Sequence, residues 1–275
     1  MEPENIINLC KDSNEDYYLR TLKSKYVAEN SFIDFYKKFE EEASYPDLFG
    51  KCVEVNSSQF KDLYNVISEI SKLLGIESPR CFIKDSYSYT IESEGLNYPW
   101  LELSAKAYND LSKKEISFLI AKELYHIANN HLYHEIMSEK MFDLINSLPN
   151  IPGINIISKF GGDIFFEHKE FQYRQTAFQW FRSACLSADN FALSYIKDLK
   201  SSIDAILLTV LNERKMVDQI DLKRYINQIA NIETCLNPMA TLEKINEVLP
   251  YGPYRMLNLL RFYLSENYYK LENNL

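Results

Sequence analysis

Residues Leu111–His131 read LSKKEISFLIAKELYHIANNH, and they contain the most informative pattern in the chain. The serine at the second position is a typical helix N-cap, so we expect a long helix from about residue 113 to 147. On this helix Lys122 and His126 lie one turn apart on the same face, with Glu123 about a quarter-turn round from Lys122. A histidine at position 122 would give H-E-x-x-H, in which two imidazoles bind zinc and the glutamate is the general base. Alone, K-E-x-x-H is explained more simply as an exposed polar pair on a helix.

Strand and helix patterns surround this segment. Before it, apolar residues between Phe60 and Leu74 share one face of a helix that Gly75 ends. Four short runs before the long helix are typical of strands: Cys52–Val55, Arg80–Lys84, Tyr87–Ser93 and Trp100–Leu103. After it we expect helices at about 168–198, 201–213, 220–230, 237–248 and 252–271. Because strands are few and all precede the long helix, the predicted fold class is α+β and helix-dominated.

The composition is that of a globular chain. Its 275 residues include 30 Lys+Arg and 39 Asp+Glu, which give a formal net charge of −9, and 46% of them are hydrophobic. This apolar content excludes a disordered or fibrous protein, and the acidic balance argues against nucleic-acid binding, which needs a basic surface. Glycines and prolines are few, and five of them fall within 149–162, which predicts a connection there. We expect an N-terminal helical extension over 1–49 and one compact domain over 50–275.

The sequence predicts a soluble, cytoplasmic protein. No apolar run approaches the roughly 18 residues that a membrane span needs, and the acidic start MEPENIINLCKDSNED does not resemble a signal peptide. The five cysteines are scattered and form no C-x-x-C pair, which favours reduced thiols over a disulfide framework or a zinc ribbon. They stand at positions 10, 52, 81, 185 and 235.

Several further motifs occur in an order that resembles a known enzyme family. S-P-R-C-F-I at 78–83 and W-L-E-L-S at 100–104 precede the Leu111–His131 segment, and W-F-R-S-A-C-L-S-A-D at 180–189 follows it. Pro250–Leu260, with an arginine inside, comes last. Over about residues 50–270 this order is similar to the HtpX-like zinc metallopeptidases, in particular their soluble members. The resemblance implies a zincin-like, gluzincin-type fold in which a small sheet lies beside the active-site helix.

The resemblance also implies roles for individual positions, and two of the three metal ligands are replaced. The family binds zinc through two histidines and one glutamate. The first histidine corresponds to Lys122, the second is retained as His126, and the glutamate corresponds to Cys185. Glu123 stands at the position of the general base, and Asp189 at that of a supporting aspartate four residues after the third ligand.

These replacements predict a site without a metal cofactor. A catalytic zinc needs three protein ligands and an open position, whereas a protonated lysine repels a dication. If zinc bound as the alternative, His126 and a Cys185 thiolate would be its only good ligands. On one continuous helix His131 would be rotated by about 140° from His126, so we do not expect it to complete the site. We hypothesise that the Lys122 ammonium takes the place of the ion and pairs with Glu123 or Asp189.

Two neighbours are expected to support the site without taking part in chemistry. Arg182 is expected to hold Asp189 or a helix end. His131, together with His134 and Glu135, is expected on a polar helix face near the cleft.

Two classes of function stay open. The first is a catalytically degenerate peptidase, or pseudopeptidase, that binds a peptide or protein partner in the former active-site groove. Its strand with Trp100, Leu101, Glu102 and Leu103 would pair with an extended segment. The second is an active enzyme, either an unorthodox zinc metalloendopeptidase or a hydrolase with a Cys185 nucleophile and a His126 base. Because two ligands are lost, we favour the first.

Overall fold

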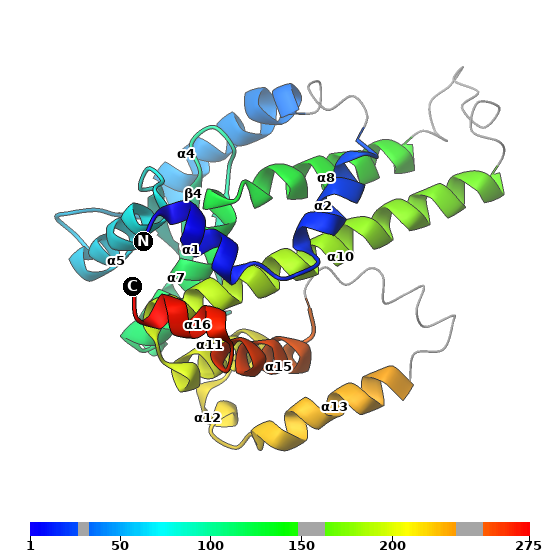
Figure 1. Ribbon diagram of the computed structural model, residues 1–275. Helices are drawn as coiled ribbons and strands as arrows, with labels where there is room; N and C mark the ends of the chain where they lie inside the picture. Colours follow the sequence, from blue (N-terminus) through cyan, green and yellow to red (C-terminus); the bar gives the residue numbers. More distant parts are fainter. Residues whose placement is uncertain (27–32, 148–162, 235–249) are drawn as a thin grey trace.

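The computed structural model describes residues 1–26, 33–147, 163–234 and 250–275 (Figure 1). Helices dominate these residues, and a small mixed sheet accompanies them, which confirms the α+β, helix-dominated class. The helices before the K-E-x-x-H segment are α1 (Pro3–Cys10), α2 (Glu15–Lys23), the π-helical η1 (Tyr36–Glu41), α4 (Glu42–Lys51), α5 (Lys61–Leu74) and α6 (Ala105–Asp110). Those that follow are α7 (Lys113–Ala128), α8 (His131–Ser147), α10 (Asp163–Ile196), α11 (Leu199–Leu211), α12 (Arg214–Val217), α13 (Leu222–Thr234), α15 (Gly252–Tyr263) and α16 (Glu266–Glu272).

The sheet has four strands in the order β1-β2-β4-β3. Its strands are β1 (Val53–Val55), β2 (Arg80–Lys84), β3 (Ile91–Glu94) and β4 (Trp100–Ser104). Strands β2 and β4 are parallel, and both outer pairs are antiparallel. The strand predicted over Tyr87–Ser93 corresponds to β3, which begins at Ile91 and forms an edge of the sheet. This edge packs on α7.

The prediction that residues 100–103 would pair with an extended peptide is wrong. Strand β4 already has a hydrogen-bonded neighbour on each side, so it has no free edge. Trp100, Leu101 and Leu103 are buried, and the Glu102 carboxylate accepts hydrogen bonds from Lys84 and from the Trp100 indole. Among the strands of the described residues, β3 is the one that has an open edge next to the helix with K-E-x-x-H.

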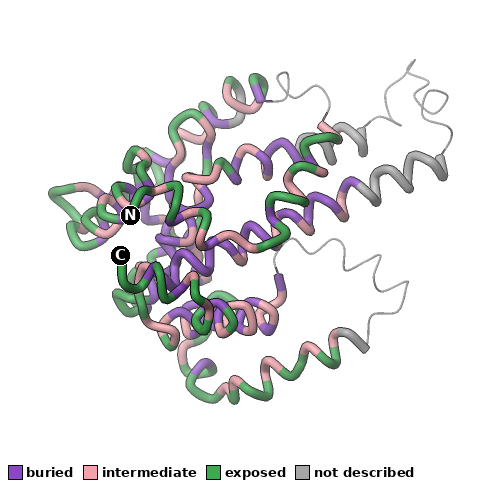
Figure 2. Tube along the Cα trace, viewed as in Figure 1, coloured by how far each residue is buried: buried purple, intermediate pink, exposed green. Residues whose placement is uncertain are grey.

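Helix α7 is at the centre of the core. It packs against α5, α10, α11 and β3, and most of its residues from Ile116 to His126 are buried. Figure 2 shows that buried positions gather where α7 and α10 meet, whereas α13 is largely exposed. Ile6 and Cys10 of α1 are fully buried in this same core. The N-terminal extension expected over 1–49 thus contributes α1 to the main core.

The long helix predicted over 113–147 is interrupted, so that prediction is wrong at its middle. Helix α7 ends at Ala128 and α8 begins at His131. Between them Asn130 has φ +58°, a left-handed conformation that asparagine tolerates better than most residues. The side-chain amide of Asn129 donates to the Tyr125 carbonyl oxygen at 2.9 Å and caps the end of α7. The interruption redirects the chain and changes which side chains His126 contacts.

Most other predicted elements are confirmed with shifted ends. Helices α5, α10, α11 and α13 and strands β1, β2 and β4 lie where the patterns indicate, while the predicted helix over 252–271 is divided into α15 and α16. The predicted helix at 237–248 and the breaker-rich connection at 149–162 lie outside the described residues. Within the part of the chain that the structure describes, no helix has both the length and the apolar character required to cross a membrane.

Candidate functional site

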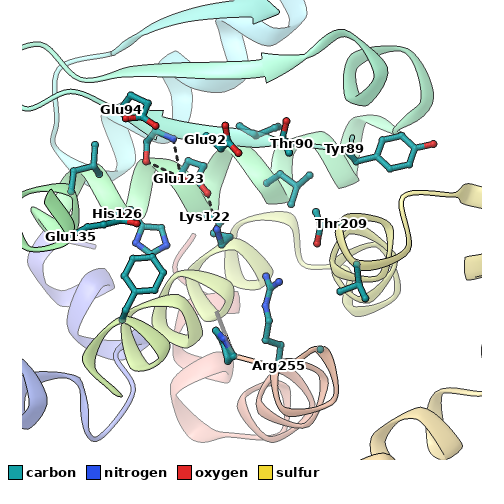
Figure 3. Close-up of a pocket in the computed structure, with 18 of the residues that line it drawn as sticks. Tyr89, Thr90, Glu92, Glu94, Lys122, Glu123, His126, Glu135, Thr209 and Arg255 are labelled. Atoms are coloured by element: carbon teal, nitrogen blue, oxygen red, sulfur yellow. Dashed lines mark hydrogen bonds and ion pairs between the residues drawn. The ribbon is translucent and has the colours of Figure 1, made fainter. Parts of the chain in front are cut away.

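A pocket of about 690 Å³ lies between strand β3 and helices α7, α8 and α15 (Figure 3). Its floor is the α7 face that carries the K-E-x-x-H motif, and the segment from Tyr89 to Glu94 forms one wall. The charged and imidazole side chains that line it are Glu92, Glu94, Lys122, Glu123, His126, Glu135, Glu139 and Arg255. Three of the predicted site residues, Lys122, Glu123 and His126, thus meet in this pocket.

Lys122 and Glu123 form an ion pair at the middle of the pocket. The Lys122 Nζ lies 2.7 Å from Glu123 Oε1, and the two side chains are only 15% and 10% exposed. Glu123 Oε2 accepts hydrogen bonds from the Ser93 backbone N–H at 3.2 Å and from its hydroxyl at 2.8 Å. Burial would lower the pKa of Lys122, but nearby negative groups, Glu123 foremost, outweigh that effect and raise it. The lysine is therefore a permanent cation, and both carboxylate oxygens are engaged.

Asp189 forms a second, deeper ion pair. Its two oxygens accept hydrogen bonds from Arg255 Nε at 2.8 Å and from Nη2 at 2.7 Å, in a bidentate arrangement. The Asp189 side chain is 0% exposed and that of Arg255 is 7% exposed. The guanidinium that holds Asp189 is thus that of Arg255 from α15, and the other expectation for Arg182, that it holds a helix end, stays a prediction.

His126 is linked to the N-terminal region through a second histidine. His126 Nδ1 lies 2.9 Å from His131 Nδ1, and His131 Nε2 lies 3.1 Å from Glu15 Oε1 of α2. Glu15 also accepts a hydrogen bond from the Ser187 hydroxyl. The expectation that His131 would point away from His126 is wrong, because α7 ends before His131 and the chain changes direction there. No sequence signal connects Glu15 to these histidines, so sequence reasoning missed it.

His126 is an uncharged imidazole in this environment. Burial, followed by the charge of Lys122 and the proximity of His131, keeps the pKa of His126 well below its usual value. Its ring is stacked on Phe181, with the two ring centroids 6.2 Å apart. Packing and hydrogen bonding therefore fix the ring of His126, which lines the pocket.

Cys185 lies in the core under the pocket. It is 1% exposed and, like the other described cysteines, it is a free thiol. Burial raises the pKa of Cys185 to about 12, and the nearby charges of Lys122 and Arg255 offset only part of this effect. The thiol is therefore protonated at neutral pH and behaves as a small apolar group.

One end of the pocket is acidic. Burial, together with repulsion from neighbouring glutamates, raises the pKa of Glu94 to about 7 and that of Glu135 to about 8. Neither carboxylate has an ion-pair partner among the residues that the structure describes. The sequence indicated Glu135 near the cleft, but it gave no signal for Glu94, whose position depends on the edge strand.

The residues at the expected ligand positions do not fit a catalytic zinc. Position 122 presents a cation, and position 185 presents a buried, protonated thiol. Across the described ranges, no three His, Cys, Asp or Glu side chains are grouped so that they could hold a metal ion. A catalytic zinc requires three such ligands.

Comparisons with known proteins give no support for the family resemblance beyond the sequence motifs themselves. No protein-family model matches the chain, and no curated protein or solved structure is significantly similar to it.

Proposed function

We propose that this chain is a catalytically degenerate relative of the HtpX-like zinc metallopeptidases. In this proposal it is a pseudopeptidase with a zincin-like fold that binds an extended peptide segment, alone or within a protein partner. The observation that carries the proposal is the buried Lys122–Glu123 pair in the pocket. The resemblance places a metal ligand and the general base at these two positions, and here they neutralise each other.

The contacts of Glu123 explain why hydrolysis is not favoured. A general base must accept a proton from a water molecule that attacks the substrate. Glu123 Oε1 already binds the Lys122 ammonium, and Oε2 already accepts two hydrogen bonds from Ser93. The alternative hydrolase with a Cys185 nucleophile is also disfavoured, because burial keeps its thiol protonated.

The open edge of β3 supports peptide binding. The Ser104 N–H donates to the Thr90 carbonyl at 3.0 Å, so in this antiparallel pair alternate residues of β3 face β4. Ile91 and Ser93 therefore direct their backbone groups away from β4, towards the open edge. The Ser93 N–H is used by Glu123, which leaves the Ile91 N–H and the carbonyls of Ile91 and Ser93 for an added strand.

Metal content and peptide cleavage, measured together, test the proposal. After dialysis the wild-type chain is expected to retain far less than one zinc per molecule and to cleave no member of a broad peptide library. The double variant Lys122→His, Cys185→Glu restores the family's three ligands and is expected to gain zinc. Stoichiometric zinc in the wild type, with cleavage that disappears in Glu123→Gln, contradicts the pseudopeptidase. A double variant that folds but binds no zinc contradicts the descent from a zinc site.

A further inference from the structure

The acidic end of the pocket contains carboxyl groups that have no ion-pair partner among the described residues. Figure 3 shows Glu94 and Glu135 at the same end of the pocket as His126, whereas Tyr89 and Thr209 lie at the other end. Glu94 and Glu135 are also close enough to interact, since the negative charge of Glu94 is among those that raise the pKa of Glu135. Carboxylates accept hydrogen bonds and, when ionised, cannot donate them.

The chain of contacts from Glu15 makes His126 an acceptor as well. The Glu15 carboxylate can only accept, so His131 Nε2 carries the proton in that contact. We assign the acceptor role in the second contact to His131 Nδ1, so that His126 Nδ1 donates to it. A neutral His126 with its proton on Nδ1 has a lone pair on Nε2. His126 is 5% exposed, and no described residue binds its Nε2, although His126 lines the pocket.

The cations that line the pocket already have partners. Five glutamates line it, against one lysine and one arginine. Both basic residues are already used, Lys122 by Glu123 and Arg255 by Asp189. At the β3 side, Lys84 binds Glu92 at 3.2 Å and Glu102 at 2.7 Å. Glu94 and Glu135 therefore have no ion-pair partner among the described residues, and the charges of Lys84 and Lys122 offset only part of the rise in their pKa values.

We propose that this end of the pocket receives the cationic side chain, arginine or lysine, of a peptide laid along the edge of β3. The inference rests on the proposed function and adds the class of segment that is bound. A guanidinium or ammonium supplies N–H donors and positive charge together, so it satisfies the His126 lone pair and both carboxylates at once. Burial is the first cause of the raised pKa values of Glu94 and Glu135, so a cation bound beside them would favour the ionised form of both carboxylates. A neutral or acidic side chain would leave these acceptors unmatched.

Selection from a random decapeptide display library tests this assignment with the full chain. We expect arginine or lysine to be enriched at one position of the selected peptides. The best arginine peptide is then synthesised with citrulline, which keeps the shape but not the charge, and the two dissociation constants are compared by fluorescence anisotropy. The citrulline peptide is expected to bind about tenfold more weakly.

Two matched variants locate the effect. Glu135→Gln is expected to reduce the preference for arginine over citrulline to less than about threefold, while Glu266→Gln, which removes an equally negative but exposed charge, keeps the preference. Selected peptides without a basic position, or equal binding of the arginine and citrulline peptides, would overturn the inference and leave peptide binding intact. A library that yields no binder contradicts the proposed function and, with it, the inference.

Discussion

The centre of the pocket and its acidic end both contain acidic side chains, but those at the centre are paired with cations, whereas carboxyl groups at the acidic end lack such a partner among the described residues. At its centre, Glu123 is paired with Lys122, and below it Asp189 is paired with Arg255, so each negative charge has its own cation. At the acidic end, Glu135 is only partly exposed and has no described cation. Ion pairs formed within the protein support the fold. A carboxyl group at a pocket that has no cation can instead form a favourable ion pair with a bound ligand.

Breaking the deepest pair has the largest expected effect on stability. Asp189→Asn leaves the Arg255 guanidinium buried without its anion, which should lower the free energy of unfolding by about 4 kcal/mol. Urea unfolding followed by circular dichroism measures this. The exposed Asp62→Asn is the control and should leave stability essentially unchanged, although Asp62 also pairs with a lysine. Equal losses in the two variants would show that burial does not decide the role of these pairs.

Removing the central cation should cost less, because Glu123 keeps its hydrogen bonds from Ser93. Lys122→Met is expected to destabilise the chain by about 3 kcal/mol, because it leaves the Glu123 carboxylate buried without its cation. Most of this loss should disappear in the double variant Lys122→Met, Glu123→Gln, which removes both charges. Lys113→Met, at an exposed ion pair, is the matched control. A single variant as stable as the wild type would contradict the view that Lys122 neutralises the centre.

Removing a negative charge at the acidic end should increase the stability of the protein rather than lower it. The folded-state pKa of Glu135 is raised from 4.5 to about 8, so ionising it costs stability as the pH rises through this range. Glu135→Gln removes that cost. The variant should match the wild type near pH 4 and be more stable by about 2 kcal/mol near pH 9, which allows for screening by water. Thermal unfolding across this pH range, with Glu266→Gln as the control, measures the difference. A destabilised variant at high pH would mean that Glu135 has a cation after all.

The smallest expected change concerns the connection between Glu15 and the histidines. Glu15→Gln retains an acceptor for His131 but removes the negative charge. We therefore expect the free energy of unfolding to fall by about 1.5 kcal/mol. The more specific readout is the ¹⁵N spectrum of the histidine rings. In the wild type, His126 should carry its proton on Nδ1. In Glu15→Gln, the glutamine amide can present either its oxygen or its nitrogen to His131, which also allows His126 to carry its proton on Nε2. A wild-type His126 protonated on Nε2 would remove the acceptor from the pocket.

The sequence predicted the elements that depend on local patterns. The amphipathic face before Gly75 predicted α5, and the runs at 80–84 and 100–103 predicted two strands, because periodicity and caps act over a few residues. It also brought Lys122 and Glu123 together, since their contact lies within one turn of α7. These are the parts of the site that short-range geometry determines.

The remaining features depend on contacts between distant segments. The order of the strands, which makes β3 rather than β4 the open edge, is a property of the whole sheet. The left-handed Asn130 interrupts a pattern that is otherwise helical, and nothing in the spacing of apolar residues marks it. The partners Glu15 and Arg255 come from far along the chain, so no motif around His126 or Asp189 identifies them.

The origin of these partners also bears on how the protein forms. Glu15 and Arg255 are separated by most of the sequence, yet the pocket contains both Arg255 and His126, which Glu15 reaches through His131. Contacts at such separation are made late in folding, because the loop between them must close first. A nascent chain on the ribosome therefore lacks the finished pocket until α15 has emerged and docked. Under the proposed function, only molecules whose folding is complete would therefore bind a peptide in this pocket.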